Sequence, residues 1–222
     1  MKRNWDMSEV SDGKFYHRDD LVAAECGDCE GCSACCQGMG ESIVLDPYDI
    51  YRFTKHFGCR FEELLKDKIE LNMTDGVILP NLKMAGDGQR CLFLNEKGRC
   101  QIHPVRPGIC RLFPLGRIYE DRGFRYFLQV HECKKKDRGM VRVSDWLDTP
   151  NLKKYEKFIT EWHYFLLDWQ ELVKNTKDAT EQKQTIMYLL MLFFNKPYDV
   201  ASDFYPQFYQ RLDEAKGLAG LK

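Results

Sequence analysis

Residues 26–36 read CGDCEGCSACC, and this stretch decides how the front of the chain folds. Cysteines recur at every third position from Cys26 to Cys35, and Cys36 follows directly. Gaps of two residues let a chain wrap around one centre while its backbone N–H groups point at the sulfur atoms. Glycine and alanine in the gaps are small enough to permit that close approach. The stretch therefore predicts a metal bound by thiolates.

Outside this stretch the cysteines are isolated, at positions 59, 91, 100, 110 and 133. The N-terminal residues soon turn acidic and contain no apolar run, so no secretory signal is visible and a cytoplasmic location is expected. In a reducing cytosol disulfides are rare, and clustered thiols more often bind metal or perform redox chemistry. The cysteines thus indicate the chemistry of the protein but not its substrate.

Composition limits the classes of protein that the chain can belong to. Its 222 residues are 44% hydrophobic and 30% charged, which is enough apolar material for a packed core. Lys and Arg number 33 against 34 Asp and Glu, so no basic excess exists to hold a nucleic acid. The longest apolar run, residues 186–194, is far shorter than the about 20 residues of a membrane span. We therefore expect a soluble protein without nucleic-acid or membrane partners.

Glycine placement divides the chain into two regions. Fourteen of the sixteen glycines precede residue 140, which predicts short elements and many turns there and long helices behind. We expect an α+β fold in which residues 1–140 form a small, cysteine-rich metal-cluster domain with loops and hairpins. Residues 141–222 are expected to form a helical C-terminal region of about three helices, whose aromatic faces pack on that domain.

Local signals predict the elements of the front region. Asp46-Pro47 is typical of a helix start, so we expect a helix over residues 48–57 that ends at Gly58. A second helix is expected from Phe61 to Ile69, because apolar residues recur there at spacings of three and four.

Strand signals follow those helices. Residues 77–79 predict a short strand that ends at Pro80. Residues 91–102 predict a hairpin with glycine in its turn, and residues 117–130 predict a second hairpin.

Helical periodicity dominates the C-terminal region. One apolar face runs over residues 152–173, and a second helix is expected over residues 178–194, where Glu181 completes a capping box. A third helix is expected to begin near Asp203, because Pro206 fits only a first helical turn.

The isolated cysteines complete a second pattern. Residues 100–114 read CQIHPVRPGICRLFP, with Cys91 before them and Cys133 after them. Together with residues 29–36, this pattern resembles the YkgJ-like family of C-x2-C-x2-C-C proteins, which is described as zinc- or iron-chelating. The resemblance spans about residues 26–133 and implies eight metal ligands: Cys29, Cys32, Cys35, Cys36, Cys91, Cys100, Cys110 and Cys133. Cys26 and Cys59 stand outside the family pattern.

Eight cysteines suffice for two four-ligand sites, or for one cluster with a redox-active remainder. Adjacent Cys35 and Cys36 are expected to point in different directions, so that one of them crosses to a second site, as in two-cluster ferredoxins. A zinc ribbon normally presents two C-x2-C pairs separated by a loop, whereas here isolated cysteines complete a dense run. We therefore expect one or two [4Fe–4S] clusters, with zinc as the alternative, because soft thiolates bind both.

Charged residues inside the pattern have two interpretations. The guanidinium groups of Arg106 and Arg111 could offset the negative charge of a thiolate cluster or hold an anionic ligand, and so contribute to cofactor binding. They could equally form a salt bridge or hydrogen-bond loop carbonyls. His103 and His131 lie beside ligand candidates and are either ligands themselves or ordinary histidines in turns.

Three functions follow from these observations. The first is an iron–sulfur protein with an electron-transfer or cluster-dependent, protein-modifying role, acting with a protein or electron-transfer partner that the sequence does not identify. The second is a structural zinc module whose helical region binds a partner. The third rests only on a resemblance to flagellin lysine-N-methylases, which implies a methyltransferase-like enzyme acting on protein lysines. No methyl-donor site and no catalytic residue can be recognised, so the third ranks last.

Overall fold

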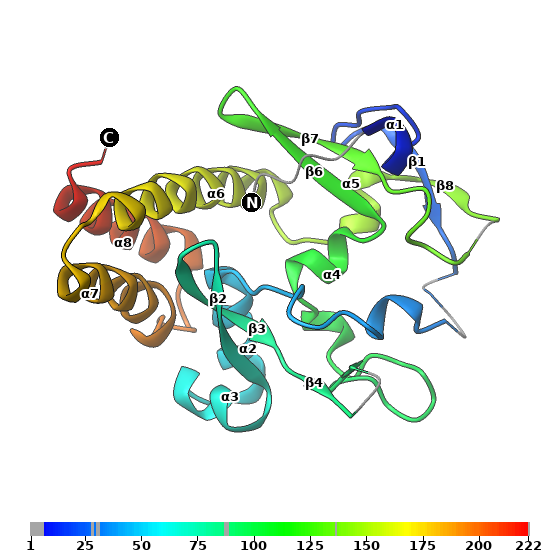
Figure 1. Cartoon of the computed structure of the whole chain (residues 1–222). Helices are drawn as coiled ribbons and strands as arrows, with labels where there is room; N and C mark the ends of the chain where they lie inside the picture. The colour runs from blue at the N-terminus through cyan, green and yellow to red at the C-terminus, as the bar shows by residue number, and fades with distance from the viewer. Residues whose placement is uncertain (1–6, 28, 30–31, 87–88, 136, 222) are drawn as a thin grey trace. The chain divides into compact units, whose positions relative to one another are not determined.

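Figure 1 shows the computed structural model of the chain, which describes residues 7–27, 29, 32–86, 89–135 and 137–221. Contacts divide these residues into two units, each built from two separate stretches. Unit 1 comprises Met1–Gly40 and Met84–Glu161, and unit 2 comprises Glu41–Lys83 and Trp162–Lys222. Helices and small antiparallel hairpins both occur, which confirms the α+β class. The division of the sequence into domains at residue 140 stays a prediction.

The described residues of unit 1 form three antiparallel strand pairs. These pairs are β1 (Leu21–Glu25) with β8 (Gly139–Arg142), β4 (Met84–Ala85) with β5 (Arg90–Cys91), and β6 (Leu115–Glu120) with β7 (Gly123–Leu128). Asp121 and Arg122 form the turn between β6 and β7, and both have positive φ, as the favoured two-residue hairpin turn requires. The hairpin expected over residues 117–130 is therefore confirmed.

The core of unit 1 anchors the elements that carry its cysteines. Short helical segments complete this unit: α1 (Met7–Val10), η1 (Ala34–Cys36), η2 (His103–Val105), α4 (Gly108–Leu112) and α5 (Val143–Leu147). The buried cluster consists of Tyr16, Val22, Ala24, Leu112, Leu115, Tyr126, Leu128, Val143 and Leu147. Val22 and Ala24 belong to β1, which precedes Cys26, and Leu112 belongs to α4, which contains Cys110. Packing in this core thus holds two separate parts of the cysteine pattern.

Unit 2 begins with the helix that its cap residues predict. α2 (Pro47–Phe57) starts after Asp46, whose carboxylate accepts a hydrogen bond from the Asp49 N–H at 2.8 Å, while Asp49 accepts one from the Asp46 N–H at 3.2 Å. This reciprocal pair satisfies two backbone donors that the helix leaves without partners. Gly58 ends the helix with φ of 61°, in the left-handed region that favours glycine.

The next element differs from its prediction. α3 (Phe61–Asp67) ends two residues before Ile69, and Ile69 instead begins β2 (Ile69–Thr74). β2 pairs with β3 (Val77–Leu82), where Ile69 lies opposite Leu82 and both side chains are buried. Pairing with a distant strand therefore overrides the helical spacing that Ile69 shares with α3.

Two strand predictions also need correction. β3 continues through Pro80 to Leu82. Both strands of a two-stranded sheet are edge strands, in which proline is tolerated. The Pro80 carbonyl accepts a hydrogen bond from the Leu45 N–H at 2.8 Å. The hairpin expected over residues 91–102 is present at its turn end, where Leu94 forms a bridge with Cys100 and the Gln101 N–H donates to the Phe93 carbonyl oxygen at 2.8 Å. Cys91 pairs with Met84 instead, a partner that local turn signals could not indicate.

The three helices expected at the C-terminus are present. They are α6 (Leu152–Asn175), α7 (Ala179–Leu190), which continues as the π-helical turn η3 (Met191–Asn195), and α8 (Phe204–Ala219). The Asp178 carboxylate caps α7 by accepting from the Glu181 N–H at 2.8 Å, and Asp203 caps α8. Both predicted starting points are confirmed.

Aromatic side chains form much of the unit 2 core. The ring centroid of Phe193 lies 4.9 Å from that of Trp162, 5.3 Å from that of Phe165 and 5.8 Å from that of Phe208. Tilted contacts at such distances are favourable for aromatic quadrupoles. The aromatic stripe of α6 within this unit is therefore core packing.

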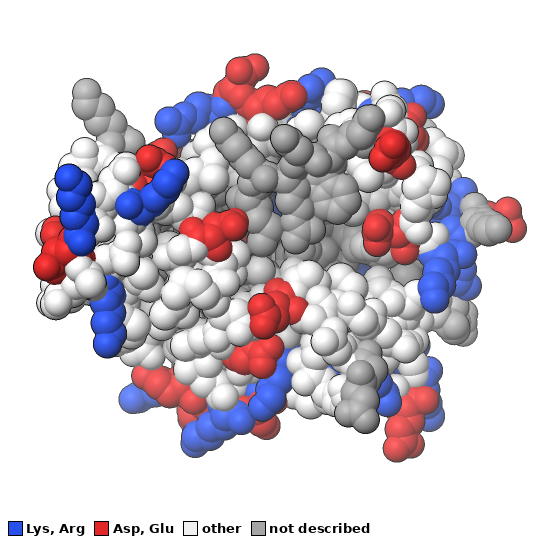
Figure 2. Space-filling view, viewed as in Figure 1, with Lys and Arg blue, Asp and Glu red and all other residues white. Residues whose placement is uncertain are grey.

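Charged side chains are interspersed on the surface. On the face drawn in Figure 2, blue and red groups alternate over the described residues, as the nearly equal numbers of basic and acidic residues predict. None of the helices among the described residues combines the length and the apolar character that crossing a bilayer requires.

Candidate metal centre

The cysteines are distributed unequally between the two units. All ten are free thiols; Cys59 belongs to unit 2 and the other nine belong to unit 1. Both stretches of the predicted pattern therefore occur within one unit.

The loop after β1 brings the first two thiols together. The Glu25 carboxylate accepts a hydrogen bond from the Gly27 N–H at 2.7 Å, and both Gly27 and Cys29 adopt left-handed φ values, of 63° and 58°. The Sγ atoms of Cys26 and Cys29 consequently lie 3.4 Å apart. Cys26, whose role the sequence pattern left open, is thus part of the thiol group. The period of three that begins at Cys26 is the signal that indicates it.

Cys35 and Cys36 influence each other's ionisation in the tight turn η1. Interaction with Cys36 lowers the pKa of Cys35 to about 7, with a further contribution from backbone N–H donation. Interaction with Cys35 and burial raise the pKa of Cys36, and the charges of neighbouring cysteines add to that effect. The expectation that the two side chains point in different directions, so that one crosses to a second site, stays a prediction.

Cys91 and Cys100 accept hydrogen bonds from the backbone. Burial raises the pKa of both thiols, but N–H groups of Phe93 and Leu94 lower that of Cys91 and the N–H of Ile102 lowers that of Cys100. Backbone donors aimed at sulfur stabilise the thiolate, which is the form that binds metal. The local fold around both residues therefore suits metal ligation.

Charges act between the two stretches of the pattern. Cys35 interacts electrostatically with Cys91 and Cys100, and Cys36 interacts with Cys91 and Cys110. Because each neighbouring thiolate raises the pKa of the next, the group is electrostatically unfavourable when every thiol is ionised. A bound cation removes this repulsion, so the donor set fits a soft, positively charged metal centre.

Arg106 supplies positive charge to this group. Its guanidinium lowers the pKa of Cys29, Cys35 and Cys100, and it lies 2.8 Å from Nε2 of His103. For Cys29, however, burial and the hydrogen bond with Cys26 outweigh the effect of Arg106 and raise the pKa to about 12. This effect is the one that the charge-offsetting interpretation requires, and the role of Arg106 in cofactor binding stays a prediction.

Arg111 makes different contacts. Its side chain is buried, and it donates to the carbonyl oxygen of Pro104 at 2.5 Å and to that of Asp148 at 2.6 Å. The Asp148 carboxylate also accepts from it at 3.2 Å. These contacts match the interpretation in which Arg111 holds loop carbonyls, and its role in cofactor binding stays a prediction.

Other predicted residues are not brought into the group. Cys32 and Cys133 are half-buried, His131 is exposed, and the described structure shows none of them in contact with another cysteine side chain. Among the described residues, no three Cys, His, Asp or Glu side chains already stand as a complete set of metal ligands. The 3.4 Å between Cys26 and Cys29 is close to the about 3.8 Å that two tetrahedral thiolate ligands with bonds of ~2.3 Å would adopt. This pair therefore has about the spacing of two ligands on one metal ion.

Comparison with known families agrees with this geometry. The family model CxxCxxCC, described as "Putative zinc- or iron-chelating domain", matches residues 28–138, which is half of the chain. The chain belongs to the CxxCxxCC family. No curated protein and no solved structure matches it.

Membership in the CxxCxxCC family confirms the resemblance read from the cysteine pattern. The matched range contains all the cysteines of the predicted ligand set and excludes Cys26. Metal binding is therefore the function that this family and the convergent thiols support, with zinc and iron both admitted.

Proposed function

We propose that the chain binds a [4Fe–4S] cluster and uses it as a one-electron carrier for a protein partner. The observation that carries this proposal is that the dense run and the isolated cysteines of the pattern belong to one unit, where the charges of Cys91 and Cys110 act on Cys36. A buried thiol so placed among others has a strongly raised pKa, and only a bound cation would keep it ionised at neutral pH.

The spacing of the cysteines favours iron–sulfur over zinc, because a zinc ribbon normally presents two C-x2-C pairs, whereas here isolated cysteines complete a dense run. Direct or electrostatic interactions link seven thiols, more than the four that one zinc ion or one [4Fe–4S] cluster takes: Cys26, Cys29, Cys35, Cys36, Cys91, Cys100 and Cys110. Cys32 and Cys133 complete the set that the family pattern implies. Such a cluster, when bound, supplies reversible one-electron reduction.

The residues of the chain have definable roles around this centre. The convergent cysteines hold the metal, backbone N–H groups at Cys91 and Cys100 stabilise their thiolates, and Arg106 offsets the negative charge of the ligand set. The positive charge of a nearby guanidinium stabilises the reduced, more negative state of a cluster. Arg106 is thus expected to raise the reduction potential.

Metal analysis of protein prepared without oxygen tests the proposal. We expect about four iron atoms and about four sulfide ions per chain, visible charge-transfer absorption, and bleaching on reduction. Colourless protein with zinc at one or two ions per chain would replace the proposal with the zinc alternative. Colourless protein without either metal would refute metal binding altogether.

Substitution of single cysteines tests the ligand set. Cys36→Ser is expected to lose most of the iron and part of its stability, because metal-binding energy is also folding energy in such sites. Cys32→Ala and Cys110→Ala are expected to do the same. Cys59→Ser is the matched control, since the Cys59 thiol interacts with Glu63, Lys68 and Asp67 and with no described cysteine. Equal loss of iron in Cys59→Ser and Cys36→Ser would contradict this ligand assignment.

A further inference from the structure

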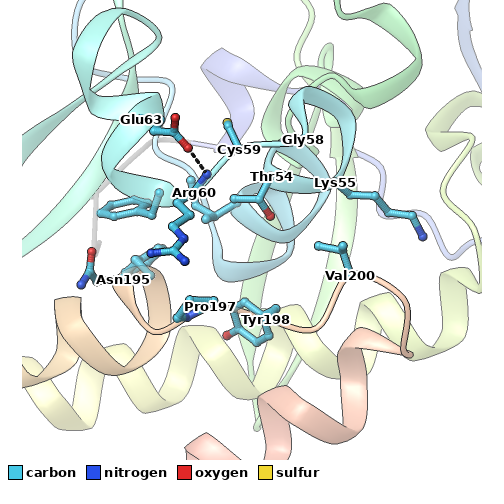
Figure 3. Close-up of a pocket in the computed structure, with 13 residues that line it drawn as sticks. Thr54, Lys55, Gly58, Cys59, Arg60, Glu63, Asn195, Pro197, Tyr198 and Val200 are labelled. Atoms are coloured by element: carbon cyan, nitrogen blue, oxygen red, sulfur yellow. Dashed lines mark hydrogen bonds between the residues drawn. The ribbon is translucent and has the colours of Figure 1, made fainter.

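Unit 2 contains a cavity that the metal-binding role does not use. Its volume is about 440 Å³, within the range of about 300–1,000 Å³ that is usual for small-molecule sites. Figure 3 shows the residues around it. Its walls are formed by Ile50, Thr54, Lys55, Gly58, Cys59, Arg60, Phe61, Glu63, Phe194, Asn195, Pro197, Tyr198 and Val200.

Two parts of unit 2 form the walls of this cavity. One wall is the junction of α2 and α3, where the left-handed Gly58 turns the chain sharply. The opposite wall is the end of η3 and the segment after it, and π-helical turns of this kind often occur at functional sites. Arg211 holds this second wall, because it donates to the carbonyl oxygens of Lys196 and Pro197 at 2.7 Å each. The buried Arg211 side chain therefore fixes the backbone of the second wall.

Much of the lining is apolar and buried. Ile50, Phe61, Phe194 and Tyr198 are each more than nine-tenths buried, and Val200 adds apolar surface at the rim. An apolar ligand group that covers these side chains would be removed from water, which is the main source of affinity in such sites.

The cavity also contains an available cation. In Figure 3 the guanidinium of Arg60 extends toward Pro197 and Tyr198. Its backbone N–H donates to the Glu63 carboxylate at 2.9 Å, but its side chain makes no hydrogen bond or ion pair with any residue that the structure describes. A guanidinium offers paired N–H donors that match the two oxygens of a carboxylate.

The other ionisable groups of the cavity do not cancel this charge. The Glu63 carboxylate is held at the start of α3 by the Arg60 N–H, and the ammonium of Lys55 points away from the Arg60 guanidinium (Figure 3). Burial raises the pKa of the Cys59 thiol, so that it is neutral. The two positive charges of Arg60 and Lys55 exceed the single negative charge of Glu63, and this excess favours an anionic ligand.

We propose that this cavity binds a small carboxylate with an apolar body, its carboxylate on Arg60 and its apolar group on Phe61, Phe194 and Tyr198. All of its lining residues belong to unit 2 and none is a proposed metal ligand, so the inference does not depend on the identity of the metal. It adds a binding function for an aliphatic or aromatic acid to the metal-binding function.

Titration of the metal-loaded full chain with 3-phenylpropionate tests this assignment, with the uncharged 3-phenylpropanamide as the matched probe. Binding is measured by calorimetry and by saturation-transfer NMR. We expect saturable binding of the acid and at least about ten-fold weaker binding of the amide, because a charge-assisted hydrogen bond is lost.

Two variants locate the site. Arg60→Gln is expected to reduce the affinity for the acid to that for the amide. Arg52→Gln makes the same change of charge on α2 outside the cavity lining and is expected to leave both affinities unchanged. Circular dichroism confirms that each variant is folded, and iron content is measured in parallel. Absence of saturable binding of the acid, equal affinity for both probes, or unchanged affinity in Arg60→Gln would each overturn the proposal.

Discussion

Replacement of Arg211 by methionine is expected to destabilise unit 2 strongly. Arg211 lies on α8, is 5% exposed, and donates to the carbonyl oxygens of Leu192, Lys196 and Pro197 at 2.8, 2.7 and 2.7 Å. Its guanidinium also lies 3.6 Å from the centre of the Tyr198 ring. These carbonyls belong to the end of η3 and to the segment that follows it. One side chain therefore satisfies the acceptors that the helical end leaves open.

The contacts set the expected magnitude. The Leu192 carbonyl is in a buried hydrogen bond, and leaving it without a donor costs about 1.5–3 kcal/mol. The other two bonds are partly buried, so water can replace part of each, and their loss costs about 1 kcal/mol apiece. Methionine keeps much of the apolar stem of the side chain in place. We therefore expect a loss of about 3–5 kcal/mol in the free energy of unfolding, the range found when one partner of a buried charged pair is removed.

Urea unfolding followed by tryptophan fluorescence measures this loss, because Trp162 and Trp169 are buried in unit 2. Lys216→Met on the same helix is the matched control and should change stability by less than about 0.5 kcal/mol. The loss of unfolding free energy in Arg211→Lys should lie between those of Arg211→Met and Lys216→Met, since an ammonium group can reach fewer of the carbonyls. A loss below about 1 kcal/mol in Arg211→Met, or one equal to that of the control, would refute the reasoning.

Three further predictions concern the metal centre and the start of α2. Cys26→Ser should lower iron content and alter visible absorption, because the Cys26 and Cys29 sulfur atoms lie 3.4 Å apart; an unchanged spectrum would place Cys26 outside the site. Arg106→Gln should lower the reduction potential and accelerate metal loss to a chelator, whereas Arg106→Lys should retain most of both properties; identical behaviour of the two variants would contradict a role for charge. Asp46→Ala should destabilise unit 2 by about 1–2 kcal/mol in thermal or urea unfolding, and no change would mean that the cap is dispensable.

Local signals in the sequence predicted the elements whose causes lie within a few residues. Asp46, Gly58 and Asp178 act on the backbone groups next to them, so α2 and α7 begin or end where the sequence indicates. The turn at Asp121 and Arg122 specifies its hairpin for the same reason. Caps and turns are short-range interactions, and a distant part of the chain changes them little.

Predictions that depended on distant partners were less successful. Ile69 has helical spacing but forms a strand, because Leu82 pairs with it. Cys91 was expected in a hairpin with residues that follow it and pairs with Met84 instead. Spacing along the chain does not reveal these partners, because strand pairing joins residues through space.

The cysteine pattern by itself indicated metal binding, since thiols at this density and spacing are typical of metal sites, and membership in the family supports it. Only the tertiary structure placed the Cys26 and Cys29 sulfur atoms 3.4 Å apart, brought the charge of Arg106 to act on Cys29, Cys35 and Cys100, and directed Arg111 to loop carbonyls. Residue types alone indicate which side chains can bind a metal. The distances and charge effects between those side chains depend on how the core places β1, η1 and α4. The core residues come from several stretches of the sequence, so no single stretch specifies this placement.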